Sequence, residues 1–306
     1  MATLLARKKH ILAKVESTYG TDPTPTQAIQ TSNLRITPLA GPTVSRNLDR
    51  ATLGNDLDIL VGTYVQLSFE VELAGSGTAG TAPAYNDLLL ACGMADTVVA
   101  STSVTYAPVS TAFDSATIYF KHDGQEHILT GARGSWSLNA DAGTLPKLTF
   151  TFMGLYNVPS SQSDGTPDFS AFTVAKPVNN ANTTTFSLHG GAVVMEKFSM
   201  DLANQVEYRN VVGGESIQLF DRAPAGSTAF EAPAISDKNW FEIARANTLG
   251  ALSMVHGTVA GNIATLSAPK VQVMSPEYAG DNISTIQASL GFIPDSGDDE
   301  VTLAFT

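Results

Sequence analysis

The side chains that could carry out chemistry are few and lie far apart in the sequence. Histidines stand at positions 10, 122, 127, 189 and 256, and only His122 and His127 are near one another. A zinc site needs three or four converging ligands, so two imidazoles on opposite strands of one predicted hairpin favour a cross-strand polar pair. Cys92 lies in an apolar helical run and is expected in the core. We therefore predict no catalytic residue, no metal site and no cofactor.

Other catalytic or ligand-binding motifs are also missing. The sequence contains no G-x-S-x-G pattern, which marks the nucleophile of many hydrolases. The glycine-rich stretch 75–80 has no lysine that could bind a phosphate, and it is predicted to be a mobile loop. The acidic stretch 295–300 lacks calcium-ligand spacing and favours a solvated turn. These patterns indicate that the protein is not an enzyme.

Composition restricts the classes of partner. Of 306 residues, 43% are apolar, only 15% are charged, and the formal net charge is −12. An acidic chain lacks the clustered Lys and Arg that hold nucleic acid, although nucleic acid can still pass along it. Few charges are typical of a surface covered by other copies of the chain, or of an ordinary neutral β-protein. One cysteine, no membrane-length apolar run and no signal cleavage site predict synthesis and folding in a cytoplasm.

The elements that would position any site are mainly strands. Apolar and polar residues alternate in 65–73, 135–141 and 145–152, which is the pattern of strands with one buried face. Asp123-Gly124 divides 116–131 into two strands and is typical of a tight hairpin turn. Only 83–93 and 236–250 have helical patterns, the second with Ser236 as its expected N-cap.

The order strand, strand, helix, hairpin, hairpin occurs twice. Residues 115–154 resemble 250–291, and "LSFEVELA" (67–74) resembles "STAFEAPA" (227–234). Further upstream, 44–56 resembles 206–216. Two unrelated sets of hairpins would give a similar pattern, so the repeat is a hypothesis. It predicts a mainly β chain with an N-terminal arm (1–32), a first β domain (33–156), a linker (157–185) and a second β domain (186–306), each domain with one short helix.

Five stretches closely resemble the tail tube, or major tail, proteins of long-tailed bacteriophages, especially transposable phages with non-contractile tails. They are residues 11–26, 67–93, 131–156, 176–184 and 189–217. The resemblance spans nearly the whole chain and implies two tandem tail-tube-type β-sandwich domains. It also implies a structural virion protein of the tail, assembled in the host bacterial cytoplasm.

What the resemblance implies about partners starts with the chain itself. Tube proteins form rings in which inner sheets join edge to edge, and the rings have six-domain symmetry. Two domains per chain then predict a trimeric, pseudo-sixfold ring that stacks into a tube. Tape-measure, tail terminator and baseplate or distal tail proteins are expected partners, and double-stranded DNA is expected to cross the lumen without specific binding during ejection. No membrane contact is implied.

Two sets of residues follow from this interpretation. The N-terminal arm is expected to bury apolar side chains against a neighbouring ring, and its removal (1–25) to leave a folded chain that does not stack. The expected inter-ring residues are Ile11, Leu12, Val15 and Tyr19. A lumen wall that releases DNA should be acidic or small and polar, because a basic wall would retain phosphates. The candidate lumen residues are Asp49, Asp56, Asp58, Glu70, Glu72, Thr149, Thr151, Asp201, Glu207 and Glu215.

Three other functions remain open. A capsid-decorating or host-glycan-binding β-sandwich would need exposed aromatic residues, whereas the pattern around Trp136 and Trp240 predicts burial. A β-rich hydrolase would need a nucleophile and a base, which the sequence does not place together. A contractile injection system would use a related tube inside a sheath, and the sequence does not indicate whether a sheath exists.

Overall fold

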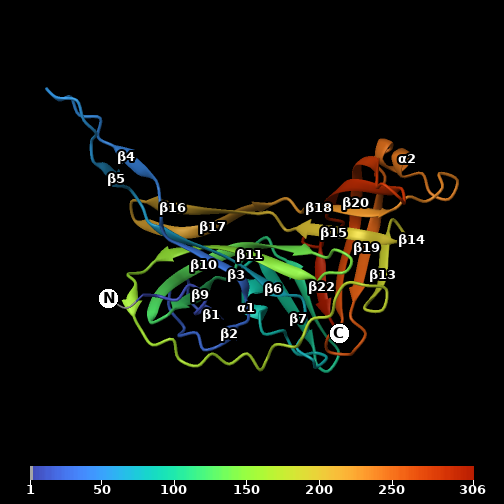
Figure 1. Ribbon diagram of the computed structural model, residues 1–306, viewed down its shortest axis with the longest axis horizontal. Coiled ribbons are helices and arrows are strands. Elements are labelled where there is room, and N and C mark those ends of the chain that lie inside the picture. Colours follow the sequence, from blue (N-terminus) through green and yellow to red (C-terminus); the bar gives the residue numbers. More distant parts are fainter. Residues whose placement is uncertain (1–2) are drawn as a thin grey trace.

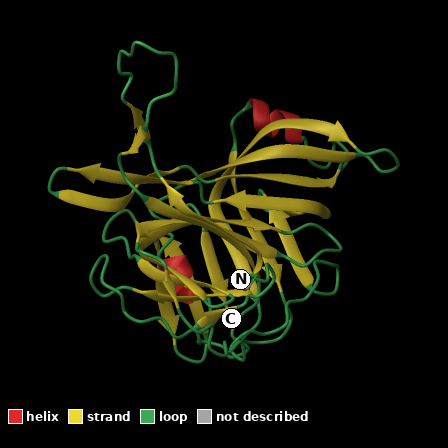
Figure 2. Cartoon of the chain, turned by 60° about the vertical axis from the view of Figure 1, so that its left-hand side comes forward, coloured by secondary structure: helices red, strands yellow, loops and turns green. Residues whose placement is uncertain are grey.

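The computed structural model describes residues 3–306 and consists almost entirely of antiparallel β-structure (Figures 1 and 2). Within that range the α-helices are α1 (Asn86–Leu90) and α2 (Trp240–Arg245), both shorter than the predicted segments. The prediction of a mainly β chain with two short helices is confirmed. Asn239, not Ser236, caps α2, because its side chain accepts a hydrogen bond from the Glu242 amide at 3.0 Å.

The strands fall into two runs along the chain. The first run comprises β1 (Lys9–Val15), β2 (Ala28–Ile29), β3 (Ser32–Ala40), β4 (Thr43–Ser45), β5 (Asp58–Leu60), β6 (Tyr64–Glu72), β7 (Met94–Val99), β8 (Ser103–Pro108), β9 (Ala116–His122), β10 (Gln125–Asn139), β11 (Lys147–Tyr156) and β12 (Ser160–Ser161). The second run comprises β13 (Thr183–Leu188), β14 (Gly191–Ala192), β15 (Met195–Asp201), β16 (Asn204–Val211), β17 (Gly214–Arg222), β18 (Ala225–Glu231), β19 (Leu249–His256), β20 (Ala264–Ala279), β21 (Thr285–Ile293) and β22 (Thr302–Phe305).

Both runs pair their strands in the same order. The first run pairs as β1-β9-β10-β11-β6-β3, and the second as β13-β19-β20-β21-β18-β15. Each run also has a hairpin, β4–β5 or β16–β17, that continues from its outermost pair of strands. This common order supports the repeat hypothesis, while the proposed domain boundaries stay a prediction.

Strand pairing also defines which residues of the two runs correspond. Glu72 lies opposite Lys147, as Glu231 lies opposite Thr285, so Val71 corresponds to Phe230. Aligning 67–74 with 227–234 letter by letter instead pairs Val71 with Glu231, one residue away. Since successive side chains of a strand point to opposite faces, that slip would exchange a core residue for a polar one.

The first run folds over a bend in its longest strand. The register of β10 shifts between Thr130 and Arg133. The first part of β10 pairs with β9, and the remainder extends past the end of that pairing. Gly131 lies at the bend with φ +58°, and a Cβ there would lie 2.7 Å from the Tyr19 ring, so a side chain would not fit. The predicted Asp123-Gly124 turn has positive φ at both residues, as a two-residue hairpin turn requires.

The core lies between the sheet layers and continues through both runs. Every second residue of the alternating strands points into this core, including Phe69, Trp136 and Phe150. Trp240, from the second run, is buried in the same core. Trp136 and Trp240 are both 1% exposed, which confirms their predicted burial. Residues 157–185 run along the surface between β11 and β13 (Figure 1), where the Val178 amide donates to the Thr144 carbonyl at 2.8 Å.

Candidate functional site

The candidate functional site is a single antiparallel sheet that crosses from one run to the other. Its strand order is β3-β6-β11-β10-β15-β18-β21-β20. Its centre is the pairing of β10 with β15, and its outer edges are β3 and the end of β20. Among residues 3–306, no strand pairs with the outer side of β3 or with the outer side of 277–279. The sheet therefore ends in two open edges.

One face of this sheet packs on the core and the other carries small polar side chains. Cross-strand neighbours on the polar face include Thr151 opposite Ser68 and Ser135, and Ser227 opposite Ser199 and Ser289. The hydroxyl groups of Ser199 and Ser227 lie 2.8 Å apart. Ser and Thr hydroxyl groups thus make up much of this face.

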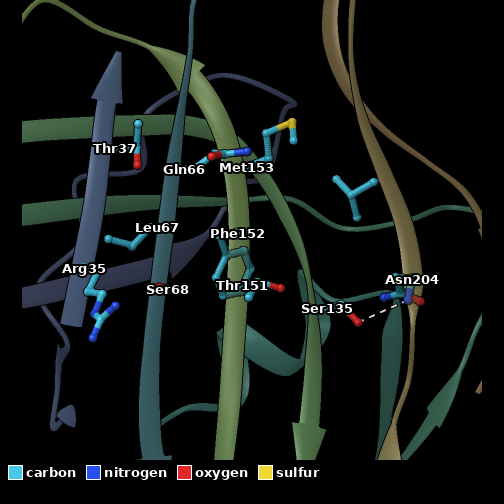
Figure 3. A pocket seen from close by; sticks show the side chains of 11 residues that line it. Arg35, Thr37, Gln66, Leu67, Ser68, Ser135, Thr151, Phe152, Met153 and Asn204 are labelled. Atoms are coloured by element: carbon cyan, nitrogen blue, oxygen red, sulfur yellow. Dashed lines mark hydrogen bonds between the residues drawn. The ribbon is translucent and has the colours of Figure 1, made fainter. Parts of the chain in front are cut away.

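The polar face is shallowly hollowed. One depression, with a volume of about 470 Å³, lies over β3, β6, β11 and β10 and is bordered by Asn204 and Val206 (Figure 3). Ser135 at its floor accepts a hydrogen bond from the Asn204 amide at 3.1 Å. A second depression of about 330 Å³ lies over β18, β20 and β21. Both are open surfaces rather than enclosed ligand pockets.

Charges on the polar face are sparse and of both signs. Lys147 Nζ lies 2.7 Å from Glu70 Oε2, and Asn33 donates to Glu70 Oε1 at 2.7 Å. The hydrogen bonds from Lys147 and Asn33 lower the pKa of Glu70, so it stays ionised and its charge is balanced locally. The face is therefore close to neutral around Glu70, where the sequence had suggested an acidic surface.

The structure places only half of the candidate lumen residues on this face. Glu70, Glu72, Thr149, Thr151 and Asp201 lie there, on β6, β11 and β15. The others lie on the two hairpins: Asp49, Asp56 and Asp58 in the segment of β4–β5, and Glu207 and Glu215 in β16–β17. Alternation predicts which face a residue occupies, but it does not predict which strands leave the sheet.

The joint between the two runs is a regular antiparallel pairing. Ser137, Leu138 and Asn139 lie opposite Asp201, Met200 and Ser199. Ala140 and Phe198 exchange both backbone hydrogen bonds, at 2.9 and 3.3 Å, and the Leu202 amide donates to the Trp136 carbonyl at 3.1 Å. Leu138 is 0% exposed and Met200 1% exposed. The joint thus buries apolar side chains as completely as the rest of the core.

The hairpin β16–β17 adds further contacts between the two runs next to the joint. It packs on β10 and β11, and Arg133 donates to the Ile217 carbonyl at 3.0 Å and to the Phe113 carbonyl at 2.8 Å. Ile217 is buried in this contact. A hairpin that continues from one run therefore covers the neighbouring run.

The N-terminal segment differs from the expected arm, because β1 is paired within its own chain. β1 pairs with β9 along its whole length, and Ile11 is 0% exposed within its own chain. Tyr19 is partly buried, and its hydroxyl accepts a hydrogen bond from the Ile217 amide at 2.6 Å. Leu12 and Val15 keep some exposure. Ile11 is therefore not free to contact a neighbouring ring, and loss of residues 1–25 would remove a core strand.

A buried carboxylate fixes this segment to the sheet. Glu16 is buried, and its Oε2 accepts hydrogen bonds from the Gly20 amide at 2.7 Å and the Ser115 hydroxyl at 2.6 Å. Its Oε1 accepts from the Thr117 hydroxyl and the Gly131 amide, both at 2.7 Å. A carboxylate can accept hydrogen bonds at both oxygens, and here all four bonds come from N–H or O–H donors.

We expect Glu16→Gln to lower the free energy of unfolding by about 2–4 kcal/mol, because the new NH₂ group would face donors that lose their acceptor. Urea unfolding of the dilute protein, followed by circular dichroism, measures the change. Glu72→Gln, at an exposed position on β6, is the matched control and should change little. Equal stability of the two variants would contradict the anchoring role of Glu16.

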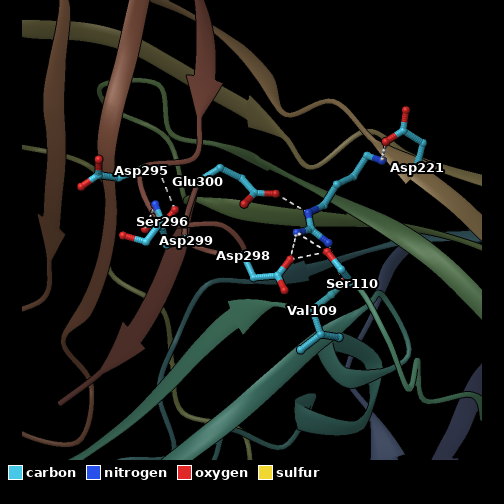
Figure 4. A network of polar contacts seen from close by, with 9 residues as sticks. Val109, Ser110, Asp221, Asp295, Ser296, Asp298, Asp299 and Glu300 are labelled. Carbon is cyan, nitrogen blue, oxygen red and sulfur yellow. Dashed lines mark hydrogen bonds and ion pairs between the residues drawn. The ribbon is translucent and has the colours of Figure 1, made fainter.

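The acidic stretch 295–300 is not simply a solvated turn. Glu300 is 4% exposed and bonds to Arg222 at the end of β17, as does Asp298 (Figure 4). Arg222 also donates to the Val109 carbonyl at 2.6 Å, and the Ser110 hydroxyl bonds to Asp298. The network ties the C-terminal loop to the first run, so its carboxylates serve the fold.

The other candidate chemical groups serve packing. His122 and His127 are not direct cross-strand partners, and both rings lie edge-on to Phe120 at 6.0 Å. Cys92 is 0% exposed, and burial raises the pKa of its thiol. Within residues 3–306, no three His, Cys, Asp or Glu side chains converge as a metal site would require. None of the helices in this range is long and apolar enough to cross a membrane.

A family model described as phage tail tube protein matches residues 6–294, nearly the whole chain. No curated protein matches the sequence.

Proposed function

The chain belongs to the phage tail tube protein family, and from this premise we propose that it polymerises into stacked rings that form a DNA conduit. The family is structural, so the chain is a component of the virion tail and not an enzyme. The observation that carries the proposal is the pairing of β10 with β15, in which two runs of equal strand order already meet edge to edge.

We propose a ring of three chains. At the β10–β15 joint, one rotation relates the two similar runs of strands. The same rotation between neighbouring chains would bring together the open edges β3 and β20. A repeated head-to-tail contact of this kind closes when its rotation divides a full turn. Closure also removes both open strand edges, which would otherwise invite aggregation. Six units per ring is the symmetry that the family resemblance implies.

The polar face would line the lumen of the ring. Its serines, threonines and balanced Glu70–Lys147 pair offer no dense array of positive charge, so passing phosphates would meet few ion-pairing partners, of which Arg35 and Lys197 are two. The candidate lumen residues on this face are Glu70, Glu72, Thr149, Thr151 and Asp201. We propose that double-stranded DNA crosses this lumen without specific binding during ejection into the host.

Stacking of rings and the other tail proteins complete the proposal. Leu12 and Val15 keep exposed surface that a neighbouring ring would cover. Tape-measure, tail terminator and baseplate or distal tail proteins are the proposed partners, with assembly in the host cytoplasm and a non-contractile tail. A glycan-binding virion protein has less support, because Trp136 and Trp240 are both buried.

Concentrated, purified protein tests the ring directly. We expect electron microscopy to show rings with six similar lobes, and mass photometry to give about three times the chain mass of 32.1 kDa. Dilution should return the monomer, as expected for a reversible joint. Rings of six chains, or a monomer at every concentration, would contradict the trimeric ring.

A further inference from the structure

The two open edges of the sheet correspond, residue by residue, to the two edges that meet inside the chain. On β20, Glu277, Tyr278 and Ala279 occupy the places that Ser137, Leu138 and Asn139 have on β10. On β3, Arg35, Ile36 and Thr37 occupy the places that Ser199, Met200 and Asp201 have on β15. Each open edge therefore corresponds to an edge that is paired with a partner strand within the chain.

We propose that β20 of one chain pairs with β3 of the next in the register of the internal joint. This inference rests on the proposed ring and adds its contact surface. Glu277 then lies opposite Thr37, Tyr278 opposite Ile36, and Ala279 opposite Arg35 of the second copy. The occupant of each edge is another copy of this chain.

Burial at the two joints supports this register. The internal pair Leu138 and Met200 is fully buried, whereas their counterparts are exposed at the open edges: Tyr278 is 56% exposed and Ile36 is partly exposed. Pairing the edges would bury both apolar side chains at the core boundary, where Tyr278 already packs against Phe241 with ring centres 5.0 Å apart. Glu277 and Arg35 would lie diagonally across the joint, within reach of a long side chain and opposite in charge.

Two prolines mark one end of the paired stretch. Pro38 corresponds to Leu202, whose amide donates across the internal joint at 3.1 Å, and a proline has no such donor. Pro276 precedes Glu277 on the other edge. In the proposed register Pro276 lies opposite Pro38, and prolines interrupt the pairing of an open edge, so the paired stretch ends there, just beyond Glu277 and Thr37.

The hairpin β4–β5 fits the same joint. Its counterpart β16–β17 lies across β10 and β11 of the neighbouring run. In contrast, β4–β5 projects away from the rest of the chain (Figures 1 and 2), at the end opposite α2 in Figure 1. The projecting segment exposes apolar side chains that its own chain does not cover. They are Val44, Leu48, Leu53, Leu57, Ile59 and Leu60. In the proposed joint this hairpin crosses β20 and β21 of the second copy, near Gln272, the counterpart of Arg133.

Disulfide trapping tests the register, since the single native cysteine is buried. The pair Ser137 and Asp201 lies between hydrogen-bonded pairs, where side chains approach most closely. Its counterpart is Glu277→Cys with Thr37→Cys, which we expect to form disulfides between chains, seen as covalent dimers and trimers on a non-reducing gel. Ser137→Cys with Asp201→Cys is the intrachain benchmark and should give an oxidised monomer.

The control for register is Glu277→Cys with Arg35→Cys. These positions are diagonal in the proposed joint, and their Cα atoms lie beyond the span of a disulfide. Rings that form with no cross-link at Glu277–Thr37, or with a cross-link only at Glu277–Arg35, would overturn this register and leave the ring intact. Double variants and wild type that all stay monomeric would overturn the proposed function together with the joint.

Discussion

Tyr278→Asp is expected to leave a folded monomer that does not form rings. Tyr278 is 56% exposed in the isolated chain, so a carboxylate there remains solvated and the fold is little affected. In the proposed joint the side chain enters the environment of Leu138, which is 0% exposed, and an unpaired buried carboxylate costs about 3–5 kcal/mol. Each joint would weaken by about a hundredfold to several thousandfold. Because every ring contains the joint three times, assembly should be lost at concentrations that suffice for wild type.

Sedimentation velocity and circular dichroism together measure this outcome. Tyr278→Phe keeps the apolar ring and should assemble as wild type does. Val259→Asp places the same charge at an exposed apolar position in a turn away from both open edges, and it should also assemble. Rings of Tyr278→Asp at the wild-type concentration would show that this edge of β20 is not part of the contact, whereas an unfolded variant would show that Tyr278 supports its own chain.

Much of the fold follows from the sequence because alternation reports burial directly. The strands at 65–73, 135–141 and 145–152 and both tryptophans lie where the pattern predicts. Alternation does not report what a strand pairs with. The apolar run around Ile11 was too short to distinguish an arm from a core strand, and its pairing with β9 depends on residues more than a hundred positions away.

The proposed assembly surface is harder to predict from the sequence for a related reason. A residue at an open edge such as Tyr278 lies among Ser, Pro and Gly residues that are typical of a turn. The apolar ring of Tyr278 can be interpreted only by comparison with Leu138, the corresponding residue of the first run. That comparison requires the correct register between the two repeats. At low identity the stretches 67–74 and 227–234 can be matched one residue out of step. Strand pairing removes this ambiguity because the two faces of a strand are not interchangeable.

The charge of the polar face can be changed without substituting a residue of either joint, which separates assembly from conduction. Gln66, Thr151 and Ser227 are exposed on this face, on β6, β11 and β18. None of them lies in the stretches 35–37 or 277–279. A variant with Lys at all three positions should therefore build tubes of normal length.

Such tubes should retain DNA. Each lysine offers a phosphate contact that displaces counterions, and stacked rings repeat these contacts along the whole lumen. We expect particles carrying Gln66→Lys, Thr151→Lys and Ser227→Lys to release DNA at least about tenfold more slowly in low salt. Release should recover at high salt, because the Debye length falls from about 10 Å at 0.1 M to about 3 Å at 1 M. Release triggered in vitro and followed with a DNA-binding dye measures both rates.

An equal charge change outside the polar face provides the control for this expectation. Lysines at Thr102, Ser160 and Val259 lie at exposed positions on turns and on β12, outside the eight-strand sheet. If retention depends on charge facing the DNA, this variant should release DNA at the wild-type rate at every salt concentration. Equal release by both variants in low salt would mean that the polar face does not line the lumen. Slow release by both would mean that net charge, and not its position, controls ejection.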